Sequence, residues 1–269
     1  MTIASRNNVK VIGSGHKTIV MAHGFGCDQN MWRFLTPSFT SDYRIVLFDY
    51  VGSGRSDANS FKVERYSNLD GYAQDVIEVC EALDLRDVLF IGHSVSAMIG
   101  LIAAIRAPAL FGQLVMVCPS PSFLNDPPDY MGGFEHEDLE ELLALMDRNY
   151  IGWAHYLASA VIGTGNDEAL IAELSGNFCS TDPLLAKTFA RATFFADCRS
   201  LLPETSHPTL ILQSETDSLA PLSVGSYMQA RMPGSRLEVV RASGHCLHMT
   251  HAAEIAEIIR GFSDQHSGL

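Results

Sequence analysis

Short apolar runs alternate along the chain with stretches whose apolar residues recur at helical spacing. Buried strands are predicted at residues 18–22, 44–48, 88–91, 114–118 and 209–212, and a strand at the edge of the sheet is predicted at 236–240. Helices are predicted at 97–106, 223–231, 252–262 and 67–83, the last from a capping-box pattern at Ser67 and Asp70. Because strands and helices alternate, we expect an α/β fold with a mainly parallel sheet and helices on both faces.

The alternation stops between residues 122 and 204, where only helical patterns occur. The first pattern has apolar residues at positions i, i+3, i+4 and i+7, namely Leu139, Leu142, Leu143 and Met146. Asp182 followed by Pro183 predicts the start of a fourth helix. We expect a lid over the carboxyl edge of the sheet, where ligands bind in α/β folds; a purely structural second domain is the alternative. The predicted division is core at 1–121, helical lid at 122–204 and core again at 205–269.

The segment Gly92-His93-Ser94-Val95-Ser96 lies between a predicted strand and a predicted helix. A serine on such a sharp turn is typical of the nucleophile elbow, G-x-S-x-G, of the α/β-hydrolases. Ser96 replaces the final glycine of that pattern, and a residue this small still lets the helix approach the strand. Ser94 is therefore the candidate nucleophile.

A serine nucleophile needs a histidine base, and the histidine needs a carboxylate that holds its tautomer. Asp217 lies in the polar loop after the strand at 209–212, and His245 lies in the loop before the last helix. The order Ser94, Asp217, His245 is the one found in α/β-hydrolases. The residues themselves leave some alternatives open: Glu215 as the acid, and His248 or His251 as the base.

An oxyanion formed at the site needs two backbone N–H donors. One is expected from Val95, directly after the serine, and the other from Phe25 in the loop His23-Gly24-Phe25-Gly26 after the first strand. The G-x-G at 52–54 is interpreted as a structural turn, because no third glycine and no helix follow it at once. No pattern of a zinc or calcium site occurs, and we expect neither a metal nor another cofactor.

The composition of the chain limits the classes of binding partner and the location that we expect for the protein. A formal net charge of −13 argues against binding to nucleic acid or to an anionic membrane. No apolar run reaches the ~18 residues of a membrane span, and the first 15 residues lack the pattern of a signal peptide. The six cysteines are scattered, which favours buried reduced thiols and a cytoplasmic protein.

Several longer segments resemble one branch of the α/β-hydrolases. Residues 92–100 are similar to the nucleophile segment of the plant strigolactone and karrikin receptors. Similarity to the bacterial stress-response regulator RsbQ covers more segments, at 48–54, 69–75, 125–128, 132–135, 149–153, 178–183 and 244–249. The chain is thus identified as resembling the RsbQ and strigolactone–karrikin receptor-like family over essentially its full length.

This resemblance implies a lid of four helices inserted after the sixth strand, over a largely apolar pocket. It puts the catalytic triad on Ser94, Asp217 and His245, and the oxyanion donors on Phe25 and Val95. The pocket positions that it implies are Phe25, Val95, Phe123, Phe134, Leu142, Trp153, Leu157, Phe194 and Leu219. Most of these are aromatic or aliphatic, so a small apolar ligand with one electrophilic carbonyl is expected. The same apolar spacing could also reflect packing between lid and core.

The resemblance implies a serine hydrolase that acts on a small apolar ester or lactone, butenolide-like, with a role in signalling. A second hypothesis is a ligand sensor whose turnover is incidental and which regulates a partner such as a PAS-domain phosphatase. A third is a metabolic esterase or a carbon–carbon bond hydrolase. Dehalogenases and epoxide hydrolases are disfavoured, because they use a carboxylate where this chain has Ser94.

Overall fold

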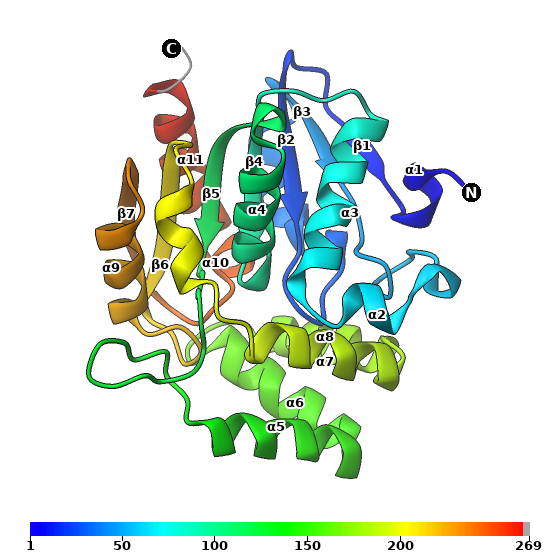
Figure 1. Ribbon diagram of the computed structural model, residues 1–269, viewed down its shortest axis with the longest axis vertical. Coiled ribbons are helices and arrows are strands. Elements are labelled where there is room, and N and C mark those ends of the chain that lie inside the picture. The colour runs from blue at the N-terminus through cyan, green and yellow to red at the C-terminus, as the bar shows by residue number, and fades with distance from the viewer. Residues whose placement is uncertain (266–269) are drawn as a thin grey trace.

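A seven-stranded sheet forms the centre of the molecule in the computed structural model, which describes residues 1–265 (Figure 1). The strand order is β1-β3-β2-β4-β5-β6-β7, and only β1 runs antiparallel to its neighbour. The strands are β1 Lys10–Ile12, β2 Lys17–Ala22, β3 Tyr43–Leu47, β4 Val88–His93, β5 Phe111–Val117, β6 Thr209–Thr216 and β7 Ser235–Ser243. The expected parallel sheet is confirmed, and β7 lies at its edge as predicted.

Helices cover both faces of this sheet (Figure 1). The helices of the core are α1 Ile3–Arg6, α2 Val63–Tyr66, α3 Leu69–Ala82, α4 Val95–Arg106, α9 Leu222–Arg231, α10 Leu247–Thr250 and α11 Ala252–Gln265. Short 3-10 turns lie at Gln29–Phe34, Thr36–Ser38, Ala58–Ser60, Pro108–Leu110 and Arg199–Glu204. Side chains alternate across the pleat of β2, so Val20 packs with α3 and α4, whereas Ile19 and Met21 pack on the side of α11.

The N-cap of α3 lies one residue after the predicted one, Ser67. Asn68 caps the helix, and its side-chain oxygen accepts a hydrogen bond from the backbone N–H of Asp70 at 3.0 Å. Ser67 has helical backbone angles, and its hydroxyl turns back toward the carbonyl of Glu64. An N-cap needs an extended backbone, which Asn68 has and Ser67 lacks.

Four helices between β5 and β6 form a helical insert (α5–α8) beside the carboxyl edge of the sheet (Figure 1). They are α5 His136–Arg148, α6 Tyr150–Ile162, α7 Glu168–Ser180 and α8 Pro183–Phe194. The side chain of Asp182 caps α8 by accepting the N–H of Leu184 at 2.9 Å, as the Asp-Pro pattern predicts.

The insert follows the fifth strand of the described chain, β5, and not the sixth. The difference arises at the N-terminus, where residues 3–6 form a helix capped by Thr2 and only one strand, β1, precedes β2. Among residues 1–265, no helix combines the length and the apolar character that crossing a bilayer requires.

Candidate active site

Ser94 stands at a tight turn between the end of β4 and the start of α4. Its backbone has a φ of +55° and a ψ of −122°, a conformation that is unfavourable for a residue with a side chain. The turn is held by a hydrogen bond from the N–H of Ser94 to the carbonyl of Val117 at 2.8 Å. Gly92 is required there, because a methyl group on it would lie 2.4 Å from the carbonyl oxygen of Ser96.

A continuous path of hydrogen bonds joins Ser94, His245 and Asp217. The Ser94 Oγ lies 2.8 Å from Nε2 of His245, and Nδ1 of His245 lies 2.7 Å from Oδ2 of Asp217. The other carboxylate oxygen of Asp217 accepts the N–H groups of Leu219 and Ala220 at 2.9 and 3.2 Å. All three side chains of the path are buried. The structure therefore brings together the three residues that the sequence singles out.

The alternatives from the sequence lie elsewhere. Glu215 is exposed at the end of β6. His248 packs with its ring 4.7 Å from that of Trp32 and 4.3 Å from that of His93. His251 contacts the hydroxyl of Thr250.

The Asp217 carboxylate is ionised in spite of its burial. Burial by itself would raise its pKa, but the attraction of His245, the hydrogen bond from its ring and the two backbone N–H groups outweigh that effect and lower the pKa. A charged carboxylate at this place fixes the proton of His245 on Nδ1 and leaves Nε2 to face the serine.

The two predicted oxyanion donors belong to two segments beside Ser94. Val95 is the first residue of α4, so its N–H has no acceptor within the helix. Phe25 is in the loop after β2, and its ring borders the same cavity as Ser94. Ser96 ties this loop to α4, because its hydroxyl donates to the carbonyl of His23 and lies 2.9 Å from the hydroxyl of Tyr50. Ser96 thus makes contacts that the glycine of the usual pattern lacks.

A cavity of about 30 Å³ lies directly over Ser94 and His245. Its other lining residues are Phe25, Cys27, His93, Phe123, Leu157, Val161, Leu174, Phe178, Thr193, Phe194 and Leu219. Five of the predicted pocket residues are among them: Phe25, Phe123, Leu157, Phe194 and Leu219. Leu174 and Phe178 also line the cavity. Their four-residue spacing in the sequence predicts one face of a helix, but it does not predict that this face lies over Ser94.

The remaining predicted pocket residues do not line the cavity over Ser94. Phe134 and Leu142 line an outer groove of about 510 Å³ on α5 and α6, and Leu157 and Leu219 border both the groove and the cavity. Trp153 is fully buried with its ring 6.1 Å from that of Phe25. Val95 is buried and does not line the cavity with its side chain.

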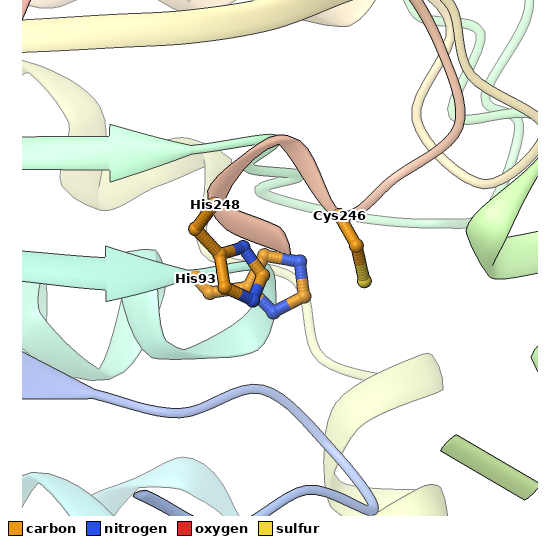
Figure 2. A group of neighbouring side chains, drawn as sticks. All are labelled: His93, Cys246 and His248. Atoms are coloured by element: carbon orange, nitrogen blue, oxygen red, sulfur yellow. The ribbon is translucent and has the colours of Figure 1, made fainter. Parts of the chain in front are cut away.

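Within the part of the chain that the structure describes, two buried groups carry side chains of the kinds that bind metals. His93, Cys246 and His248 come within 4.8 Å of one another through their ligand atoms (Figure 2), and Cys118, Asp217 and His245 form a second group. In the first group, Nε2 of His93 donates to the carbonyl of His245 at 2.8 Å, which leaves only Nδ1 for an ion.

That nitrogen faces Gly24, where a methyl group would lie only 2.4 Å from it. An ion bound to Nδ1 of His93 would therefore displace the loop that carries Phe25. In the second group, the His245 and Asp217 atoms already bond to each other. The second group thus fits a hydrogen-bonded site better than a metal centre, whereas in the first group both ring nitrogens of His248 have no hydrogen-bond partner among residues 1–265.

The family model described as "alpha/beta hydrolase fold" matches residues 17–252. Among curated proteins, the chain is 43% identical over 244 residues to Karrikin insensitive 2 receptor CA of Petunia hybrida, covering 90% of each chain. It is 36% identical over 254 residues to Strigolactone esterase D14 of Arabidopsis thaliana, covering 94% of each. Among solved structures, a hydrolase from Oleispira antarctica is 55% identical with a TM-score of 0.95, over 97% of this chain and 95% of that one.

Proposed function

The chain belongs to the alpha/beta hydrolase family, and on that premise we propose that it is a serine hydrolase that cleaves a small, apolar, butenolide-like ester or lactone. The observation that carries this proposal is the buried hydrogen-bonded path from Ser94 through His245 to Asp217, beside a cavity with mostly apolar walls. The esterase relatives in plants support the same reaction class.

In the proposed reaction, Ser94 Oγ attacks the carbonyl carbon while Nε2 of His245 takes the hydroxyl proton. Asp217 stabilises the imidazolium that forms, and the N–H groups of Phe25 and Val95 donate to the oxyanion. His245 then gives its proton to the leaving alcohol. In the second half-reaction a water molecule, activated by His245, attacks the acyl group on Ser94 and releases the acid.

A signalling role is part of this proposal, because several relatives carry the name of a receptor. The small volume of the cavity over Ser94 supports this signalling role. Ligand pockets usually measure about 300–1,000 Å³, ten times or more the about 30 Å³ found here. We infer that side chains and helices around the cavity move when a ligand binds, and that a protein partner recognises the moved insert.

A ligand sensor with incidental turnover is the second candidate, since the same small cavity favours it. Its output would be the docking of a regulated partner such as a PAS-domain phosphatase. A cytoplasmic location agrees with six cysteines that form no disulfide within the described chain.

The test of the hydrolase is Ser94→Ala, assayed with p-nitrophenyl butyrate and followed by intact-protein mass spectrometry after incubation with butenolides. Turnover and any mass adduct on Ser94 should both be lost. The matched control is Ser41→Ala, at an exposed serine remote from the cavity, and it should keep wild-type turnover. Wild-type turnover in Ser94→Ala would overturn the proposal.

The test of the sensor is hydrogen exchange of residues 136–194 with and without a bound butenolide. Protection of the helical insert should change when the ligand binds. Unchanged protection at a ligand concentration that saturates binding would rule out the sensor. A kcat well above ~1 per second on a metabolite would instead favour a metabolic enzyme.

A further inference from the structure

Five residues that line the cavity over Ser94 have polar or sulfur atoms: Cys27, His93, Ser94, Thr193 and His245. Ser94 and His245 are bonded to each other. His93 donates its Nε2 proton to a backbone carbonyl, and its other nitrogen faces Gly24. The thiol of Cys27 is only a weak donor. Among residues 1–265, Thr193 is thus the one strong side-chain donor of this lining that is not already engaged.

The hydroxyl of Thr193 is buried and has no hydrogen-bond partner among residues 1–265. Thr188, on the same helix α8, shows how such a hydroxyl is usually satisfied, because it donates to the carbonyl of Leu184 four residues earlier at 2.9 Å. Thr193 makes no such bond. Buried polar groups without a partner are rare in native proteins and call for an explanation.

We propose that Thr193 is a second polar subsite of the cavity, which donates a hydrogen bond to an acceptor oxygen of the ligand other than the carbonyl that Ser94 attacks. This inference rests on the proposed hydrolase function and narrows its substrate class. The ligand is an ester or lactone with a further ether or carbonyl oxygen, set among apolar walls that include Phe123, Phe194 and Leu219. A site with a buried donor rejects an analogue without the matching acceptor, since the donor is then left unpaired.

The experiment uses two pairs of esters in which one ether oxygen replaces one methylene. On the acyl side, p-nitrophenyl methoxyacetate is compared with p-nitrophenyl butyrate. On the alcohol side, 2-methoxyethyl butyrate is compared with butyl butyrate. For each pair the ratio of kcat/KM values is measured in the wild type and in Thr193→Val, so that the different intrinsic reactivities of the esters cancel.

Thr193→Val should lower the preference for the ether in one of the two pairs by roughly three- to tenfold, the size of one neutral hydrogen bond. Thr193→Ser keeps the hydroxyl and should keep the preference. Thr188→Val, on the same helix and away from the cavity, is the matched control and should leave both ratios unchanged.

Thermal unfolding distinguishes a role of Thr193 in ligand binding from a role in stabilising the fold. Because the hydroxyl has no partner in the described chain, Thr193→Val should unfold at the same temperature as the wild type or at a higher one. Unchanged ratios in both pairs, or a clear fall in the unfolding temperature, would overturn the inference. If Ser94→Ala also keeps turnover, the proposed function fails as well; if Ser94→Ala is inactive, only the role of Thr193 fails.

Discussion

Acid should destabilise this protein between pH 7 and pH 5 through the buried ring of His93. The carbonyl of His245 can only accept a hydrogen bond, so Nε2 of His93 carries the proton and Nδ1 is bare. Burial, and next the proximity of His245, lower the pKa of His93 to about 3. In the unfolded chain the same ring titrates near 6.5.

The magnitude follows from linkage. Well above pH 6.5 the His93 ring is neutral in both the folded and the unfolded state, so its ionisation does not lower the free energy of unfolding there. As the pH falls below 6.5, the unfolded state takes up a proton that the folded state does not bind until about pH 3, so the free energy of unfolding decreases. Between pH 7 and pH 5 this loss is about 2 kcal/mol for His93 alone. Burial also lowers the pKa of His248, which adds a loss of the same sign.

Urea unfolding at pH 7, 6 and 5 measures the loss. His93→Gln should remove about 2 kcal/mol of the pH dependence, whereas His16→Gln, at an exposed histidine, changes no buried ring and is the control. Nitrogen NMR of labelled histidines provides a measurement that does not depend on folding of the variant. The His93 signals should show a neutral ring with its proton on Nε2 down to pH 4. A ring that titrates near pH 6.5 in the folded protein would refute the reasoning.

Three substitutions test other contacts. Asp217→Asn should lower kcat by about 10⁴-fold while the fold is kept, because His245, the proposed base, loses the carboxylate that orients it; near-wild-type kcat would argue against the role of Asp217. Gly26→Ala should lower the free energy of unfolding by about 2–5 kcal/mol, since residue 26 has a φ of +69° and the new methyl would lie 1.9 Å from the ring of Phe178. Ser96→Gly should lower it by about 1–3 kcal/mol in urea unfolding, because the hydroxyl of Tyr50 loses its buried partner; an unchanged midpoint would show that the bond contributes nothing.

The sequence predicts the core well, because its signals are local. Apolar runs of strand length and the Asp-Pro start of α8 appear in the structure where they are expected. The approach of Ser94, Asp217 and His245 follows from the parallel sheet, since loops at the carboxyl ends of neighbouring strands meet at one edge. The cap at Asn68 instead of Ser67 depends on backbone angles that a capping pattern does not specify.

The cavity is harder to predict, because periodicity shows which side of a helix is buried and not what covers it. Leu142 and Leu157 have the same apolar character, yet Leu142 lines the outer groove while Leu157 reaches the cavity over Ser94. Trp153 packs behind the ring of Phe25. The lack of a hydrogen-bond partner for the Thr193 hydroxyl among residues 1–265 becomes visible only when α8 is seen in its place in the fold. Such features arise from contacts between segments far apart in the chain.

The position of the helical insert divides the site between two lengths of chain. Ser94 precedes the insert, while Asp217 and His245 follow it, and the parallel pairing of β5 with β6 joins the two halves of the sheet. The hydrogen bond from His93 to the carbonyl of His245 crosses the same seam. A single cut in a loop of the insert would therefore yield two fragments, each with an incomplete set of reacting groups. Hydrolysis by the mixed fragments would then report their reassociation, which makes this chain a candidate scaffold for a split-enzyme reporter.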